Sequence, residues 1–325
     1  MSVGSPAAQV AVVVATHRRA PLLPRLAAAM AAQEDAPGFE VVVVDDASAD
    51  GTADVLHELA RESAAPLVPV VRDVNGGPAA ARNSGWRASR AELVLFTDDD
   101  CVPEPGWVAA MVAALQQADV VQGVTIPDPE QAGRAGPFSR TIDAPAPDDL
   151  FRTCNVAYRR EVLERIGGFD ESFRVCEDTD LAWRARSGGA RTAFAPDAVV
   201  HHDVRPSSLR AQLVDARRWA DIPHVVRRHP GVRELIHSRH FWRATHGPAL
   251  AAAAGLAVAV AGGRRGRLLA PALLAPYLKL RLVDQPLPHV RRRQRLLLLP
   301  AAFAVDITEV ITLAAGSARH RCLVL

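Results

Sequence analysis

The fold prediction starts from residues 93–100, which read Leu-Val-Leu-Phe-Thr-Asp-Asp-Asp. Four apolar residues in succession predict a strand that is buried on both faces of a sheet. Three carboxylates follow where this strand would leave the sheet, and they repel one another unless a cation or a proton lies between them. Because Mg²⁺ and Mn²⁺ accept carboxylates together with substrate phosphates, we expect a divalent cation and a phosphorylated ligand at Asp98 and Asp100. A solvated acidic turn before Pro103 is the alternative.

Apolar runs and helical segments alternate along the chain before this stretch. The runs that predict strands are residues 10–15, 39–44, 67–71 and 93–96, and the segments that predict helices begin near Pro21, Thr52 and Ala79. Such alternation with short connections is typical of a parallel sheet flanked by helices. The strand over 39–44 ends in Asp45-Asp46. Parallel strands end on one edge of the sheet, where ligands bind, so we expect Asp45 and Asp98 to share that edge.

The pattern after Pro105 predicts further strands, helices and a long proline-rich loop. The expected elements are a helix at 107–117, a strand at 120–126, a loop at 127–150, a strand at 154–158, helices at 159–165 and 179–187, and strands at 192–194 and 198–200 around Pro196. The helix over 179–187 ends at Gly188-Gly189, a typical C-terminal cap.

The charge of the chain is divided unevenly between its two ends. Residues 1–204 carry 18 arginines and 30 acids, and residues 205–325 carry 20 basic residues and 6 acids, so net charges of −12 and +14 add to the overall +2. Two parts of opposite charge predict two surfaces with different partners. The four cysteines lack metal-ligand spacing, so we expect reduced thiols in the cytosol. The N-terminal sequence has no basic segment followed by a long apolar run, so we expect no signal peptide.

Several motifs, taken in chain order, resemble those of the family 2 glycosyltransferases of the GT-A fold. They are Val-Val-Val-Ala-Thr-His-Arg-Arg (12–19), Val-Val-Asp-Asp-Ala-Ser-Ala-Asp-Gly-Thr (43–52), Asn-Gly-Gly-Pro-Ala-Ala-Ala-Arg-Asn (75–83), Asp98-Asp99-Asp100, Gly167-Gly168-Phe169-Asp170 with Glu177-Asp178-Thr179-Asp180-Leu181, and His202. The resemblance covers residues 10 to about 205 and implies a GT-A, Rossmann-like α/β fold with a mixed, mainly parallel sheet and flanking helices. It also implies inverting transfer of a sugar from a nucleotide diphosphate sugar, most often a UDP-sugar, to a hydroxyl acceptor.

The resemblance gives each motif residue an expected role. The ligands of Mn²⁺ or Mg²⁺ would be Asp98, Asp100 and His202, with His201 as the alternative histidine. The donor would be bound by Thr16, Arg18, Asp45, Asp46, Gly76, Gly77, Arg82, Asp98 and Asp99. The acceptor side would be formed by Gly168, Phe169 and Glu177. Asp178 would be the general base that removes the proton of the acceptor hydroxyl.

Structural roles are open for several of these residues. Asp45 and Asp50 could cap a turn and the next helix. Glu177 and Asp180 could be acids that favour a helix start. Arg82 could brace the turn before its helix instead of binding the donor. Asp99 points to the opposite side of an extended segment from its two neighbours, so it ranks below them as a metal ligand.

The basic C-terminal part carries three apolar runs. Residues 248–261 and 268–278 are shorter than the ~20 residues of a spanning helix, and residues 296–315 include Asp306 and Glu309, which are costly in lipid. Arginines flank every run, so a spanning hairpin would place a basic loop outside, against the positive-inside rule. We therefore expect helices in the membrane interface or a re-entrant hairpin. The alternative is a soluble, Ala-rich helical subdomain.

These observations divide the chain into a catalytic domain, residues 1–205, and a helical, membrane-associated tail, residues 206–325. The tail would bind an anionic membrane surface, placing a peripheral or monotopic protein on the cytoplasmic face of the inner or plasma membrane. The expected acceptor class is then a lipid-linked or cell-envelope glycan. No QxxRW pattern follows the base motif, which favours transfer of a single sugar.

Other classes of function fit the sequence less well. A nicotinamide dehydrogenase needs glycines after the first strand, and residues 16–21 contain none. The basic tail lacks the interleaved aromatic residues of a nucleic-acid surface, so no nucleic-acid partner is expected. A non-catalytic, membrane-associated sugar-nucleotide-binding protein is the remaining alternative, and the presence of Asp178 argues against it.

Overall fold

The computed structural model describes residues 8–285, 287–288 and 290–325. The chain forms two compact units. The first unit ends at Asp203 and excludes Gly133–Arg140, and the second unit combines Gly133–Arg140 with Val204–Leu325. The sequence-based boundary at residue 205 lies two residues from this division and does not detach the 133–140 segment. Each unit is described by itself below.

The described part of the first unit contains an eight-stranded sheet with the order β3-β2-β1-β4-β7-β6-β8-β5. The strands are β1 (Val10–Thr16), β2 (Phe39–Asp45), β3 (Leu67–Val71), β4 (Leu93–Asp98), β5 (Cys101–Pro103), β6 (Val120–Pro127), β7 (Asn155–Arg159) and β8 (Thr192–His202). Strands β1 to β4 are parallel, as are β6 and β8, whereas β7 is antiparallel to both β4 and β6. The predicted mixed, mainly parallel sheet is confirmed.

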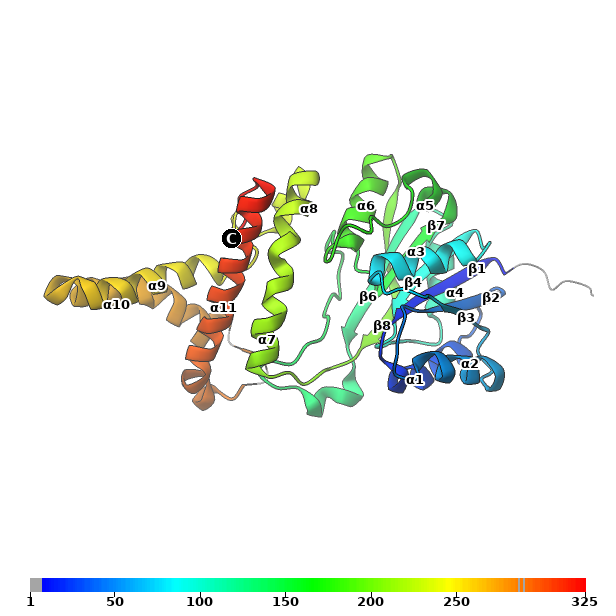
Figure 1. Cartoon of the computed structure of the whole chain (residues 1–325), viewed down its shortest axis with the longest axis horizontal. Helices are drawn as coiled ribbons and strands as arrows, with labels where there is room; N and C mark the ends of the chain where they lie inside the picture. The colour runs from blue at the N-terminus through cyan, green and yellow to red at the C-terminus, as the bar shows by residue number, and fades with distance from the viewer. Residues whose placement is uncertain (1–7, 286, 289) are drawn as a thin grey trace, which may run out of the picture. The chain divides into compact units, whose positions relative to one another are not determined.

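Helices cover both faces of this sheet (Figure 1). The helices of this part of the chain are η1 (Ala20–Leu22), α1 (Leu23–Ala31), α2 (Thr52–Glu62), α3 (Pro78–Ala88), α4 (Trp107–Ala114), α5 (Arg160–Ile166) and α6 (Glu177–Ser187). A short 3₁₀ helix without buried residues, η2 (Pro129–Arg134), follows β6 and does not belong to these layers. Successive residues of a strand point to opposite faces, so Val12 packs in the core with α1 and α4, and Val13 packs in the core with α3, α5 and α6. A strand buried on both faces requires the continuous apolar run seen in the sequence.

The edge where the parallel strands end carries the acids. Both β2 and β4 pair with β1, and the register places Asp45 beside Thr16 and Asp98 beside Ala15. Asp45 and Asp98 thus end strands that are separated by β1 alone. The expected shared edge is present.

Two predicted elements differ from the structure for local reasons. The two short strands expected around Pro196 are parts of one strand, β8. Its pairing with β6 is irregular at Pro196, because the register shifts between Gly123 and Val124 of β6. Proline lacks a backbone N–H and is tolerated at such an irregularity. The helix expected to reach Gln117 ends at Ala114, because its last amides bond three residues back, as in a 3₁₀ turn.

The second unit is helical in the residues described. It contains α7 (Leu209–Asp215), η3 (Ala216–Asp221), α8 (Ile222–Arg228), η4 (Pro230–Leu235), α9 (His246–Ala261), α10 (Gly263–Lys279), the π-helical turn η5 (Leu280–Asp284) and α11 (Arg292–His320). The Arg-rich segment over 205–243 forms short helices. Among the described helices, α11 is long and apolar enough to cross a membrane by length and composition, a test that core helices of soluble proteins also pass.

The two acids of α11 lie inside the second unit. Asp306 accepts hydrogen bonds from Thr245 Oγ1 at 2.9 Å and Tyr277 Oη at 2.6 Å, and it forms an ion pair with Arg281. Glu309 Oε2 lies 3.0 Å from His246 Nε2 and also pairs with an arginine. These contacts join α9, α10 and α11, so the cost of exposing the two charges to lipid does not arise.

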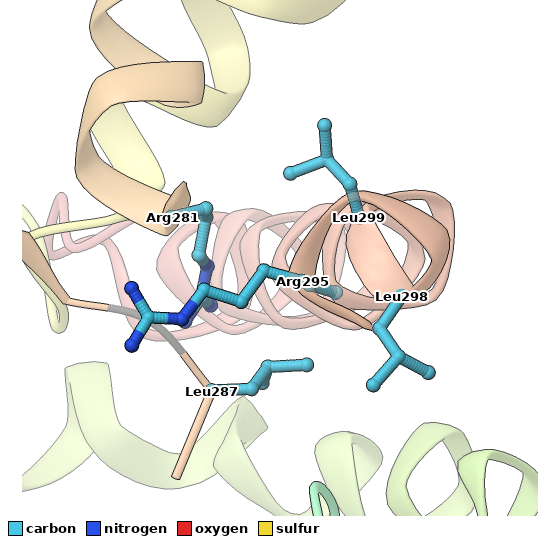
Figure 2. Close-up of a pocket in the computed structure, with 6 residues that line it drawn as sticks. Arg281, Leu287, Arg295, Leu298 and Leu299 are labelled. Carbon is cyan, nitrogen blue, oxygen red and sulfur yellow. The ribbon is translucent and has the colours of Figure 1, made fainter. Parts of the chain in front are cut away.

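Figure 2 shows a small hollow in the same unit, lined by Arg281, Leu287, Arg295, Leu298, Leu299 and Ala302. Both arginines have partners, because Arg281 pairs with Asp306 and Arg295 Nη1 donates to the Leu282 carbonyl at 2.7 Å. The residues predicted to bind the donor all belong to the first unit.

Candidate active site at the acidic edge of the sheet

A carboxylate, a thiol and an imidazole meet where β5 pairs with β8. One ligand atom from each of Asp100, Cys101 and His202 lies within 4.8 Å of the other two. Antiparallel pairing sets Cys101 opposite His202, and His202 Nε2 lies 3.7 Å from Asp100 Oδ1. The cluster joins two motifs that are a hundred residues apart in the chain.

The chemistry of this cluster fits a divalent cation. His202 Nδ1 lies 3.0 Å from the Asp203 carbonyl, which can only accept, so Nδ1 donates to it and Nε2 is the ring nitrogen that faces Asp100. Burial raises the pKa of Cys101 well above its usual value, so the thiol stays protonated and is a poor ligand. A carboxylate and an imidazole, completed by substrate phosphates, form a set that Mn²⁺ accepts.

Of the two adjacent histidines, only His202 faces the acidic edge. His201 Nε2 lies 3.1 Å from Glu104 Oε1, on the other side of the strand. The alternation of side chains along a strand separates neighbouring residues in this way.

Asp98 is held by a buried arginine and not by the metal-type cluster. Arg82, from α3, donates from Nη2 to Asp98 Oδ1 at 2.7 Å and from Nη1 to Glu177 Oε1 at 2.9 Å. Burial opposes ionisation of Asp98, but the Arg82 guanidinium outweighs it and lowers the pKa of Asp98 below its ordinary value. Arg82 therefore acts as a brace between β4 and α6.

Asp99 is engaged with the first strand and the turn after it. Its carboxylate accepts from Thr16 Oγ1 at 2.7 Å and from Arg19 Nη1 at 2.6 Å. Burial raises the pKa of Asp99 to about 6, although Arg19 opposes the rise. Arg19 Nη1 also lies 3.0 Å from Asp100 Oδ2. The prediction of donor-binding residues named Arg18, which is exposed, and did not include Arg19 beside it.

Asp45 keeps one buried oxygen without a partner among the described residues. Its Oδ1 accepts from the Ser48 amide at 3.2 Å, whereas Oδ2 is buried and unbonded. The residue is fully buried, so an unpaired carboxylate oxygen is costly unless a ligand donates to it. Asp50, by contrast, accepts from the amide and hydroxyl of Thr52, the first residue of α2, so its contact is structural.

Asp46 holds the glycine turn that begins α3. Its two oxygens accept from the Gly76 amide at 3.0 Å and the Gly77 amide at 2.7 Å, and Arg72 Nε lies 3.4 Å away. Gly77 has φ of 84° and ψ of 177°, a conformation that is open essentially to glycine alone. The amides of Gly76 and Gly77, two residues that we expected to bind the donor, therefore donate to Asp46, and the turn gives both glycines a structural role.

Phe169 and Gly168 lie in the core beside α3. The Phe169 amide and carbonyl both bond to the Asn83 side chain at 2.9 Å, and its ring packs against Phe96. A Cβ on Gly168 would meet Asn83 Oδ1 at 2.5 Å. Because Gly168 and Phe169 contact the protein interior, they hold the loop before α6 in place.

Asp178 lies in the first turn of α6, next to Glu177. Its Oδ1 accepts from the Thr179 amide at 2.7 Å. Burial, and then the charge of the neighbouring Glu177, raise the pKa of Asp178 to about 7. Asp180 is fully buried and pairs with Arg184 at 2.7 Å, so it is a structural acid of the same helix.

A small hollow opens beside the Asp100–His202 cluster. The residues that line it include Arg25, Asp99, Asp100, Cys101 and Asp203. The structure thus gathers Thr16, Asp98, Asp99, Asp100 and His202 at one edge, with Arg82 linking that edge to the helix of Asp178.

A solved glycosyltransferase has a similar structure over nearly the whole chain. The mannosyltransferase PcManGT of Pyrobaculum calidifontis, in complex with GDP-Man and Mn²⁺, matches with a TM-score of 0.67 and 25% identity, covering 94% of this chain and 88% of that chain. The class that the fold and the edge define is therefore the GT-A glycosyltransferases, and the predicted fold is confirmed.

The sequence relationship identifies the family within this class. The pattern of glycosyl transferase family 2 matches residues 11–169, and that of glycosyltransferase like family 2 matches residues 148–221. The chain belongs to glycosyl transferase family 2, as its motifs indicated.

Two curated relatives illustrate the range of the family. The pre-mycofactocin glycosyltransferase of Mycobacterium tuberculosis is 30% identical over 182 residues, which are 52% of this chain and only 38% of that protein. The succinoglycan biosynthesis protein ExoU of Rhizobium meliloti is 29% identical over 269 residues, covering 71% of this chain and 78% of that protein.

Proposed function

We propose that the chain transfers one sugar, with inversion, from a nucleoside diphosphate sugar to a hydroxyl acceptor. The observation that carries the proposal is the double contact of Arg82, whose buried guanidinium binds both Asp98 at the donor edge and Glu177 beside Asp178. This contact ties the expected donor residues and the expected base into one assembly. Family membership supports the same reaction class.

Asp45 is the proposed contact for the nucleoside. Its buried Oδ2 needs a donor, and the N–H of a base or the O–H of a ribose would supply one. UDP-sugars are the donors that the motifs imply, and PcManGT was solved with GDP-Man. Both nucleotides are therefore candidates for this chain.

Asp100 and His202 are the proposed holders of Mn²⁺ or Mg²⁺, with Asp98 nearby on the same edge. When bound, such an ion supplies Lewis-acid stabilisation of the negative charge on the departing diphosphate. Arg19 contacts Asp100 and adds positive charge at the same edge.

Asp178 is the proposed general base. An inverting transfer is a single displacement, in which the acceptor oxygen bonds to the anomeric carbon as the nucleoside diphosphate leaves with the bonding electrons. The Asp178 carboxylate accepts the proton of that acceptor oxygen. A pKa raised to about 7 suits this role, because a base near the working pH is both ionised and able to hold a proton.

The proposed acceptor is a lipid-linked or cell-envelope glycan, and the proposed location is the cytoplasmic face of the inner or plasma membrane. The basic, apolar second unit supports this location. The relative ExoU, a succinoglycan biosynthesis protein, supports the acceptor class.

A donor screen tests the proposal. The full chain would be titrated calorimetrically with UDP-glucose, UDP-GlcNAc and GDP-mannose, with and without Mn²⁺, and each mixture assayed for slow release of nucleoside diphosphate. Binding of one donor together with metal-dependent release supports the proposal. Binding without release in any mixture, unchanged in an Asp178→Asn variant, would instead support the non-catalytic sugar-nucleotide-binding alternative.

A further inference from the structure

Helices α9 and α10 form a hairpin, and small residues lie where the two helices face each other. A Cβ added to Gly255 would meet Leu273 Cβ at 2.9 Å and the Ala270 carbonyl oxygen at 3.2 Å. A Cβ added to Gly266 would meet the Val258 carbonyl oxygen at 2.1 Å. The two helix backbones therefore approach each other through glycine and alanine.

Large apolar side chains cover the outside of the same hairpin. The exposed fractions are 47% for Leu256, 87% for Val260, 75% for Leu268 and 61% for Leu269. A helix pair that packs in water places its large apolar residues inside. Small residues inside and large apolar residues outside are typical of helix pairs in lipid.

The start of α10, directly after the turn between the two helices, is strongly basic. Arg264, Arg265 and Arg267 are exposed, and the sequence contains no acid between Glu234 and Asp284. Positive charge beside exposed leucine and valine complements a surface that is both anionic and apolar. A nucleic acid has the required negative charge, but it offers no apolar phase for the leucine and valine side chains.

The base of the hairpin packs against α11, and the most exposed large apolar side chains of α9 and α10 lie beyond this base, at the tip. Ala249, Ala252 and Tyr277 pack against Phe303 and Ile307 of α11. Figure 1 shows α9 and α10 continuing past α11 beyond this packed base. The tip thus projects beyond the packed base with its large apolar side chains exposed.

We propose that the hairpin tip, residues 254–272, docks on an anionic lipid bilayer. Its leucines and valine enter the acyl boundary, and its three arginines bind lipid phosphates. The 16 residues of α9 span about 24 Å, less than the ~30 Å hydrocarbon core. The hairpin therefore lies in the interface and does not cross. This deepens the membrane location given under the proposed function, and it is independent of the sugar transfer itself.

Vesicle flotation of the full chain tests the proposal. The probes are phosphatidylcholine vesicles and vesicles with equal parts of phosphatidylcholine and phosphatidylglycerol. The wild-type chain should float with the anionic vesicles. Changing Arg264, Arg265 and Arg267 to Gln should reduce partitioning roughly 100-fold, the factor for three basic residues near an anionic surface. Changing Leu268 and Leu269 to Ser should reduce it at least ~10-fold.

Matched changes elsewhere in the same unit provide the control. Val214 and Leu323 are 57% and 55% exposed and lie outside the hairpin. A Val214→Ser, Leu323→Ser double variant should float like the wild type. Equal loss in this control, or flotation of both hairpin variants at the wild-type level, would overturn the proposal.

Two further measurements separate the other occupants and the proposed function. Sedimentation velocity without lipid would reveal a second copy on the tip, because the Leu268→Ser, Leu269→Ser variant would then change from dimer to monomer. That result would overturn lipid docking. Donor hydrolysis, measured without vesicles, should be equal in all variants. Its absence in every sample would refute the transfer reaction while leaving the flotation result intact.

Discussion

Replacing Arg82 with methionine should lower the free energy of unfolding of the catalytic unit. The replacement should not remove a direct contact with the donor. Arg82 is 5% exposed and forms ion pairs with Asp98 at 2.7 Å and Glu177 at 2.9 Å. Methionine has similar length and no donor, so both carboxylates would lose their partner. Removing one member of a buried pair typically costs about 3–5 kcal/mol. Because 23% of the Asp98 side chain and 11% of the Glu177 side chain are exposed, we expect the lower end, about 3 kcal/mol.

The cost should depend on pH in a defined direction. Arg82 lowers the pKa of Asp98 below 3.8, so its stabilisation is present above that value and is lost as the pH falls through the folded-state pKa. Without Arg82, burial is opposed only by the weaker influence of His202 and Arg19, so the pKa of Asp98 rises. The variant's carboxyl then takes up a proton at a higher pH than the wild-type carboxyl. The stability difference should therefore be largest at neutral pH and shrink as the pH approaches 4.

Urea unfolding followed by circular dichroism measures both effects. The matched control is Arg87→Met, since Arg87 lies on the same helix, is half exposed and stacks on Trp86. That control should remain within about 0.5 kcal/mol of the wild type. If Arg82→Met keeps wild-type stability at neutral pH but loses donor affinity, Arg82 is a donor ligand and the bracing role is refuted.

Three other changes test separate parts of the site and the second unit. Asp178→Asn should reduce turnover about 10²–10⁴-fold at unchanged donor affinity, and the wild-type rate should rise as the pH passes about 7, where this base ionises. Asp45→Ala should weaken nucleotide binding about tenfold or more by calorimetry through loss of a buried acceptor, whereas Asp50→Ala should leave it unchanged. Asp306→Leu leaves the Arg281 guanidinium unpaired, so the second unit should lose about 3–5 kcal/mol, visible as an earlier calorimetric transition.

The acidic edge could be predicted because its cause is local. Strands buried on both faces need continuous apolar runs, and residues 41–44 and 93–96 are such runs. Each run ends directly in an acid, and parallel pairing with a common neighbour aligns the two ends. The positions of Asp45 and Asp98 thus follow from the pattern and length of the apolar runs and from the order of the strands along the chain.

The arginine partners of these acids could not be predicted because they come from distant segments. Arg19 lies 80 residues before Asp99, and Arg82 lies 95 residues before Glu177. The pairing of β5 with β8, which brings His202 to Asp100, is also long-range, and His202 was expected beside the acids through the family resemblance alone. Sequence patterns report the face of an element, whereas these contacts depend on how elements pack.

Two expected binding residues gained structural explanations for the same reason. Asp46 uses both oxygens to hold the turn at Gly76 and Gly77, and Phe169 packs in the core against Phe96. A motif conveys which residues occur together, and binding and bracing both produce such a pattern. The unpaired oxygen of Asp45 distinguishes the two cases, because a bracing acid has its partners within the protein.

The charge asymmetry of the chain has a structural counterpart in the second unit. Residues 235–325 contain three acids, and Asp306 and Glu309 are buried in ion pairs among three helices. Asp284 lies 3.4 Å from Lys279. With the acids paired, the arginines at the hairpin turn and before α11 set the sign of the outer surface. The two acids of the long apolar helix α11 are thus buried, and the exposed surface of the second unit stays apolar and basic. An anionic bilayer attracts a surface with this combination.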